Sequence, residues 1–204
     1  IFIDIALAQV AATGVVFGTM MWGPNINDWI VQASAVGAAL ACALLVLVLD
    51  QGSKAWALTA LDERARPLLG DLVMLRLIRN PGAAFSLGAG STLLMTLIAA
   101  AITVALVVVL RRTTDRSLAV GLGAVLGGAL GNLLDRLFRA PGPGRGHVVD
   151  FISVGWWPVF NVADSAVVCG AVLLVVLSLL GYDYDGSRSG FAARRAAKVE
   201  AENA

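Results

Sequence analysis

Four long apolar stretches constrain what this chain can fold into more than any other feature. They cover about residues 33–49, 91–110, 117–134 and 162–181. A helix needs about 20 predominantly apolar residues to cross a bilayer, and stretch 91–110 has no charged residue at all. Across the chain, 14% of the residues are charged, compared with roughly 25% in soluble domains. The sequence therefore predicts a mainly α, polytopic membrane protein with a four-helix bundle.

The chain divides into three predicted parts. Residues 1–30 contain an apolar run but no basic residue, unlike a secretory signal peptide, and we treat them as a segment of unknown role. Residues 31–182 are expected to form the membrane domain. Residues 183–204 are expected to form a polar tail that is disordered toward its end.

Small residues inside the apolar stretches favour packing roles. Gly123, Gly127 and Gly131 recur at four-residue spacing in the third stretch, which indicates close approach of helix backbones. Cys42 and Cys169 both lie in apolar runs, and we interpret them as packing residues rather than as a disulfide.

The basic residues predict an orientation. They are dense in the short turn 111–116 and in the tail, so the positive-inside rule puts both on the cytoplasmic side. The segments on the other side carry as many basic residues, but over a much greater length. Among those segments, residues 71–79 alternate partly in polarity and predict a short strand, and Asn80-Pro81-Gly82 predicts a turn. We expect a small strand-rich subdomain on the non-cytoplasmic side.

Two aspartates point to chemistry. Asp150 stands in a predicted loop between apolar residues, and Asp164 lies at the start of the last apolar stretch. A carboxylate at membrane depth costs about 2.5 kcal/mol or more, and two that converge can share a proton, as a water-activating aspartyl hydrolase requires. Simpler roles exist. Asn161 and Asp164 have the spacing of a helix N-cap pair, and Asp150 can be a solvated loop residue.

The predicted topology brings further polar residues to the side of these aspartates. Such sorting favours one composite site; its members are Asp50, Lys54, Asn80, Asn132, Asp135 and Arg136. As an alternative, Asp50 and Lys54 can form an interfacial pair on the first spanning helix. We expect that helix to end at Asp50. Asp135 can simply pair with a neighbouring cation.

Five motifs resemble those of lipoprotein signal peptidase, also called signal peptidase II, and occur in the family's order. They are Asp50-Gln-Gly-Ser-Lys54, Asn80-Pro-Gly-Ala-Ala-Phe-Ser86, Gly128-Ala-Leu-Gly-Asn132-Leu-Leu-Asp135-Arg136, Val148-Val-Asp-Phe-Ile152 and Phe160-Asn-Val-Ala-Asp-Ser165. The resemblance implies a four-helix bundle in the bacterial plasma membrane, with a small strand-rich cradle and a further helix on the non-cytoplasmic side. It also implies cleavage of prolipoproteins just before their diacylglyceryl-modified cysteine.

The resemblance also implies a role for each matching residue. Asp150 and Asp164 would be the catalytic pair. Residues that bind substrate or support the pair would be Asp50, Lys54, Asn80, Gly82, Asn132, Asp135, Arg136 and Asn161, with Asp135 a structural partner of Arg136. The expected partners are prolipoproteins and membrane lipid, and not nucleic acid.

No metal or organic cofactor is expected, because the chain has one His and no cluster with metal-ligand spacing. Two other classes of function stay open at this point. A proton-coupled transporter can use intramembrane Asp and Arg residues, although these polar residues mark no path across the membrane. A non-enzymatic scaffold would tolerate loss of both aspartates. The presenilin and prepilin-peptidase type needs a Gly-x-Gly-Asp motif, which this chain lacks.

Overall fold

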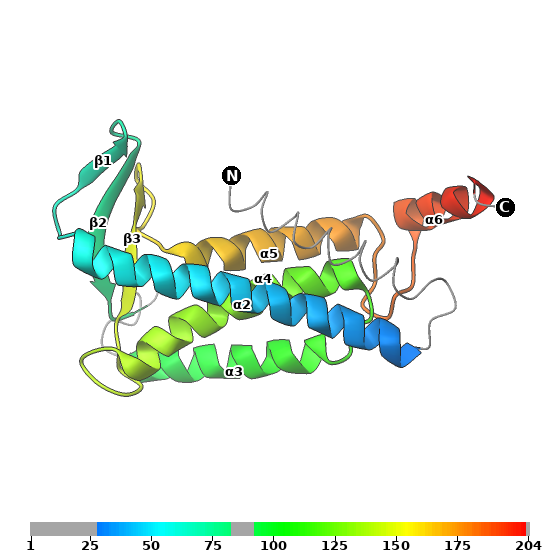
Figure 1. Ribbon diagram of the computed structural model, residues 1–204, viewed down its shortest axis with the longest axis horizontal. Helices are drawn as coiled ribbons and strands as arrows, with labels where there is room; N and C mark the ends of the chain where they lie inside the picture. Colours follow the sequence, from blue (N-terminus) through cyan, green and yellow to red (C-terminus); the bar gives the residue numbers. More distant parts are fainter. Residues whose placement is uncertain (1–27, 83–91, 203–204) are drawn as a thin grey trace. The chain divides into compact units, whose positions relative to one another are not determined.

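The structure is a computed structural model that describes residues 28–82 and 92–202 (Figure 1). Its elements are α2 (Asp28–Ala60), β1 (Arg66–Leu69), β2 (Val73–Asn80), α3 (Thr92–Leu110), α4 (Arg116–Phe138), β3 (Val148–Val154), α5 (Val162–Leu179) and α6 (Gly190–Glu202). Residues 1–27, which make up most of the N-terminal segment of unknown role, and residues 83–86 of one motif lie outside the described residues.

Four of the described helices are long and apolar enough to cross a membrane. They are Ile30–Ala60, Thr92–Leu110, Arg116–Phe138 and Val162–Leu179. The predicted mainly α fold with four spanning helices and a small sheet is therefore confirmed. One boundary was wrong, because α2 does not end at Asp50 but continues to Ala60. The charge of Asp50 does not end the helix, since Lys54 lies one turn further on and pairs with it.

Contacts along the chain divide it into two compact units, and helices α2 to α5 contribute residues to both. Among the described residues, the helix unit comprises 28–43, 106–125 and 168–202, and the sheet unit comprises 44–82, 92–105 and 126–167. Each is described by itself below.

Glycines allow close packing in the helix unit. A Cβ atom at Gly123 would lie 2.8 Å from the Cα of Ala39, and one at Gly170 would lie 2.9 Å from the carbonyl oxygen of Gly121. Such contacts leave no room for any side chain, so the helices approach through their backbones. Cys42 is buried and Cys169 is exposed, and no disulfide joins the two.

The polar tail of the helix unit begins with contacts to the turn after α3. Arg188 pairs with Asp115 at 2.6 Å and stacks on the ring of Tyr182, 4.3 Å from its centroid. The amide of Thr114 donates to the carbonyl of Tyr184 at 2.8 Å. Helix α6 follows, and its Ala192 is buried. These contacts hold the start of the tail and join segments about 70 residues apart, which local composition does not reveal.

The sheet unit contains an antiparallel sheet in the order β1-β2-β3. The strand expected over 71–79 is confirmed as β2, but Asp150, expected in a loop, lies within β3. Its neighbours Val149 and Phe151 are buried against Ala57 and Leu77. A strand covered on both faces gives a continuous apolar run rather than an alternation, which is why the pattern was missed. Within the described part of this unit, no further helix accompanies the sheet beyond the ends of α2 to α5.

Candidate active site

Strand pairing places Asp150 beside an amide side chain. Ile78 pairs with Asp150, and Asn80 pairs with Val148, so Asn80 and Asp150 lie on the same face of neighbouring strands. Asn80 Nδ2 donates to Asp150 Oδ2 at 3.0 Å, while the amide of Gly82 donates to Asn80 Oδ1 at 3.0 Å. The turn after β2 thus fixes which way the Asn80 amide points. Asp150 is 2% exposed.

Asp164 lies in the first turn of α5 and takes part in its N-cap. The amide of Asp164 donates to Asn161 Oδ1 at 2.9 Å, and the amide of Asn161 donates back to Asp164 Oδ2 at 3.1 Å. This reciprocal pair satisfies two helix N-terminal donors, so the capping role foreseen for this pair is real. The other carboxylate oxygen, Oδ1, accepts from Asn132 Nδ2 at 2.8 Å.

Asn161 links the two aspartates. Its side-chain Nδ2 donates to Asp150 Oδ1 at 2.7 Å and to Asn132 Oδ1 at 3.1 Å, while its backbone binds Asp164. Burial first, and the charge of Asp164 second, raise the pKa of Asp150 to about 7, although hydrogen bonds from Asn80 and Asn161 oppose the shift. Near neutral pH, a large fraction of Asp150 is therefore protonated beside its partner.

A buried cation lies next to this pair. Lys54 Nζ is 2.8 Å from Asp50 Oδ2 and 3.0 Å from Asp135 Oδ2, and all three side chains are fully buried. Lys54 also donates to Asn132 Oδ1 at 2.9 Å. Because Asn132 Oδ1 is held by Lys54, its Nδ2 is directed to Asp164. The pairing of Asp50 with Lys54 is therefore confirmed, but both side chains are buried within the protein rather than placed at an interface.

Asp135 has different partners from the expected one. It pairs with Lys54 and, at 2.5 Å, with Arg139, and it accepts from the amide of Val149 at 3.1 Å. The expected pairing with Arg136 is wrong, because adjacent residues on a helix point in different directions. Arg136 instead donates to the carbonyls of Gly82 at 2.5 Å and Pro81 at 3.5 Å. It thus holds the turn that carries Asn80, and its charge attracts those of Asp150 and Asp164.

Two members of this network were not among the predicted site residues. Gln51 Nε2 donates to Asp50 at 3.1 Å and to the carbonyl of Gly131 at 3.0 Å, and Arg139 donates to Gln51 Oε1 at 3.3 Å. Arg139 follows Asp135 by four residues, a spacing that could have revealed it. Gln51 lies inside a recognised motif but has partners about 80 residues away, which only the fold shows.

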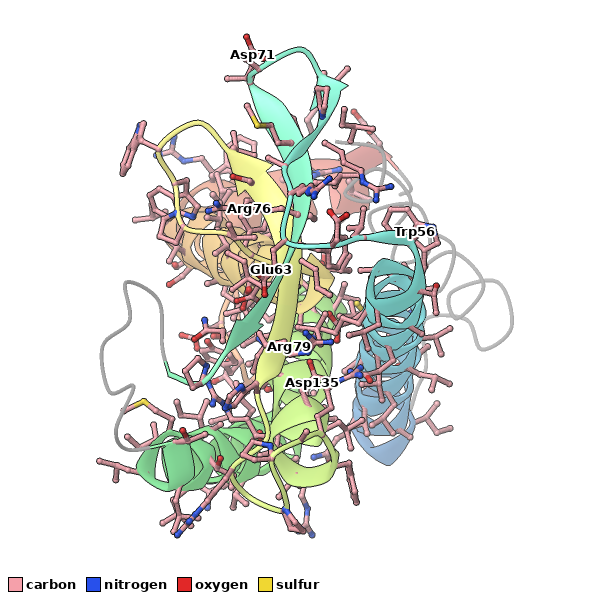
Figure 2. All side chains as sticks on the ribbon, turned by 90° about the vertical axis from the view of Figure 1, so that its left-hand side faces the viewer. Trp56, Glu63, Asp71, Arg76, Arg79 and Asp135 are labelled. Carbon is pink, nitrogen blue, oxygen red and sulfur yellow. The ribbon has the colours of Figure 1, made fainter. Side chains whose placement is uncertain are left out.

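Every predicted site residue belongs to the sheet unit, and hydrogen bonds and ion pairs join these residues into one cluster. Asp135, one of its members, is labelled in Figure 2. Asp50 extends the cluster to the start of α5, since its Oδ1 accepts from the amide of Ala163 at 2.9 Å. Among the described residues, no group of three or more His, Cys, Asp or Glu side chains is placed to hold a metal ion.

Comparison with solved structures first indicates the class of protein. Two of them, both described as bacterial membrane enzyme structures obtained by the in meso method, superpose with a TM-score of 0.62 at 28% identity. Each match covers 70% of this chain, and they cover 88% and 93% of the known chains. The chain has the fold of a multi-pass membrane enzyme.

Comparison of sequences then gives the family. The family model described as signal peptidase (SPase) II matches residues 42–180. Proteins described as lipoprotein signal peptidases are similar: one from Mycobacterium avium is 56% identical over 147 residues, covering 72% of this chain and 81% of that protein. One from Rhodococcus jostii is 57% identical over 130 residues, covering 63% of this chain and 66% of that protein, just under two thirds. The chain belongs to the signal peptidase II family, and the predicted class of enzyme, a peptidase, is confirmed.

Proposed function

We propose that this chain is an aspartyl endopeptidase that removes the signal peptide from prolipoproteins, with Asp150 and Asp164 as its catalytic pair. The observation that carries the proposal is that Asn161 donates hydrogen bonds to both carboxyl groups, from its side chain to Asp150 and from its backbone amide to Asp164. Two carboxyl groups so coupled retain one proton near neutral pH, which is the state that acid–base hydrolysis of a peptide bond needs.

The chemistry follows from that single proton. The ionised carboxylate takes a proton from a water molecule, whose oxygen attacks the carbonyl carbon of the scissile bond. The neutral carboxyl group donates its proton to the carbonyl oxygen. The tetrahedral intermediate then collapses as the C–N bond breaks. One of its hydroxyl groups returns a proton to the carboxylate that is now ionised, and the leaving nitrogen takes the proton of the other carboxyl group, so the pair again holds one proton. Each such transfer is worth about 10²–10⁴-fold. The protons belong to the pair, so neither aspartate is assigned a fixed role.

The surrounding residues have supporting roles in this proposal. Asn80, Asn132 and Asn161 orient the carboxyl groups through the bonds described above. Arg136 stabilises the turn at Gly82 and adds positive potential near the developing oxyanion. Lys54 neutralises Asp50 and Asp135, which in turn hold the start of α5 and the strand β3.

The lipid on the substrate cysteine is expected to lie against the bundle. In the sheet unit, α2 and α3 carry exposed apolar side chains, which are Leu44, Val48, Leu93, Leu94 and Leu97. Such a surface matches acyl chains, while the buried polar network lies within the same unit. In this proposal the scissile bond is the one just before the diacylglyceryl-modified cysteine, as the resemblance to signal peptidase II implies.

The site is proposed to face the non-cytoplasmic side. The support is the density of basic residues in the turn after α3 and in the tail, both in the helix unit. In the same proposal, residues 31–182 form the peptidase domain and residues 183–204 form a cytoplasmic tail.

The test is cleavage of a diacylglyceryl-modified prolipoprotein by the purified protein in detergent. Wild type is expected to cut it, and Asp150→Asn and Asp164→Asn are each expected to lose about 10³-fold or more of kcat/KM. Asp185→Asn, which changes an exposed carboxylate of the tail, is the matched control and should keep full activity. Cleavage that survives in a folded Asp150 or Asp164 variant would remove that residue from the mechanism. Equal turnover of a precursor without the lipid would refute lipid recognition.

A further inference from the structure

An apolar surface lies at one end of the sheet, outside the spanning helices. We call it the hairpin tip and define it by Leu68, Leu69 and Leu72 around the β1–β2 turn, with Trp156 and Trp157 after β3. Their exposed fractions are 59, 68, 67, 85 and 52%. Proteins rarely leave a contiguous group of large apolar side chains in water, and such groups usually mark a contact with a partner or a membrane.

The two turns that form the hairpin tip are held together. Val73 of β2 pairs with Val154 of β3, and the amide of Gly155 donates to the carbonyl of Leu72 at 3.1 Å. The rings of Trp156 and Trp157 pack edge to face with centroids 5.4 Å apart. Gly70 and Gly155 have φ values of +55° and +51°, which only glycine adopts readily. The surface is therefore a structured feature of the sheet.

The position of the sheet relates this surface to the bilayer. Residues 61–65 alone separate the end of the spanning helix α2 from β1. In Figure 1 the strands run across the axis of the neighbouring part of α2, and Figure 2 shows Asp71 at the far end of the hairpin and Trp56 near the end of α2. Since a spanning helix lies broadly along the membrane normal, the hairpin extends roughly along the membrane surface.

We propose that the hairpin tip inserts into the interfacial region of the bilayer, between the lipid headgroups and the acyl chains. Tryptophan is enriched at this depth because its ring is apolar and its N–H is polar, and Leu69 and Leu72 add exposed apolar side chains around the β1–β2 turn. Asp71 lies between them in sequence, so its carboxylate stays at the headgroup level and limits insertion to a shallow depth. The sheet is then attached to the membrane at two places, by α2 and by the hairpin tip.

The lipid interface is favoured over the substrate as the occupant because the tip is remote from the aspartates. Asp150 pairs with Ile78, five residues along β2 from Val73, which is roughly 17 Å along a strand. A substrate whose scissile bond lies at Asp150 and Asp164 would therefore have its reacting atoms far from the hairpin tip. The inference concerns attachment alone and does not depend on the proposed function.

An environment-sensitive fluorophore at the tip tests this inference. The full chain with Cys42→Ala and Cys169→Ala would carry a single NBD-labelled cysteine in place of Leu69, in phosphatidylcholine–phosphatidylglycerol nanodiscs. The matched control carries the label at Glu63, an exposed position between α2 and β1. The label at Leu69 is expected to emit at shorter wavelength, to be quenched by lipids brominated on their acyl chains, and to be several-fold less accessible to aqueous iodide than the control.

Two further results sharpen the test. Adding Leu72→Ser and Trp156→Ser is expected to bring the iodide accessibility of the Leu69 label up to that of the Glu63 label, with the unfolding temperature retained because all these positions are exposed. The inference is overturned if iodide reaches the two labels equally in the parent variants. It is also overturned if protection at Leu69 appears only after a lipidated precursor is added, or occurs without quenching by brominated lipid, which would indicate a protein partner or a second copy.

Discussion

The two halves of α4 are held in contrasting ways. In the helix unit, Gly123 lies against the backbone of Ala39, and Gly121 lies against Leu174 and Gly170. In the sheet unit, the same helix carries Asn132, Asp135 and Arg136, and each is held by hydrogen bonds or ion pairs. The first half is held by close packing at its glycines, and the second is held in addition by hydrogen bonds and ion pairs. We infer that changes in the first half mainly affect folding, whereas changes in the second half affect both folding and catalysis.

The largest expected effect concerns the buried cation of the polar half. Lys54→Met would leave Asp50 and Asp135 buried without Lys54, and breaking a buried ion pair from one side costs about 3–5 kcal/mol. Chemical unfolding in detergent measures the loss. Lys198→Met is the matched control, because its pairing with Glu202 is exposed, and such pairs are worth about 0–1 kcal/mol. Equal stability of the two variants would contradict the account of the polar half.

The next effect is a dependence of stability on pH that comes from Asp150. Its pKa is about 7 in the folded protein, well above the ordinary value of an aspartate, so the native state binds more protons than the unfolded state between these two values. Stability from this group is therefore present at low pH and lost as the pH rises toward about 7, by up to about 1.4 kcal/mol per pH unit. Unfolding of wild type and Asp150→Asn at several pH values should show a steeper fall in wild type. Parallel curves would contradict it.

A smaller effect is expected in the apolar half. Gly123→Ala would force a Cβ atom into the backbone of Ala39, and overpacking of this kind costs about 1–3 kcal/mol. Gly37→Ala is the control, because a Cβ there meets nothing within 4 Å and helix propensity favours alanine by up to about 1 kcal/mol. Thermal unfolding should separate the two variants, while the remaining folded Gly123→Ala protein keeps near-normal kcat/KM.

The smallest effect on stability, but a clear one on catalysis, is expected for Gly131→Ala. Its Cβ atom would lie 2.5 Å from Asp50 Oδ2, and the Asp50 carboxylate would shift away from Ala163 at the start of α5. A misplacement of about 1 Å at a catalytic site can cost about 10²-fold, so kcat/KM should fall well before stability does. Gly52→Ala, with open space around its Cβ, is the control. Equal activity of both variants would show that Asp50 does not position the site.

The sequence predicted the spans and the family, and both predictions are confirmed, because long apolar stretches and ordered motifs are local signals. It placed Asp150 in a loop and ended α2 at Asp50 for a shared physical reason. Each error assumed that a charged residue must be exposed to solvent. Both aspartates are buried, because amide side chains donate hydrogen bonds to Asp150 and Lys54 pairs with Asp50. Charge is a reliable boundary signal only when the neutralising partner is absent, and the partner is set by the fold.

The candidate site was predicted residue by residue, but its internal bonds were not. Asp135 was expected to pair with Arg136 and pairs instead with Lys54 and Arg139. Gln51 was overlooked because its bonds to Gly131 and Asp135 join residues 80 and 84 positions apart. The catalytic roles of Asp150 and Asp164 stay predictions, supported by their common ligand Asn161.

The most direct measurement of the central claim is the protonation state of the pair. Infrared spectroscopy of the purified protein can follow the C=O stretch of a protonated carboxyl group between pH 5 and pH 9. The account predicts a band in wild type that disappears with an apparent midpoint near pH 7 and whose titration is changed in Asp150→Asn. A wild-type protein that is folded and active but shows no carboxyl band titrating in this range would contradict the claim that the two aspartates share a proton.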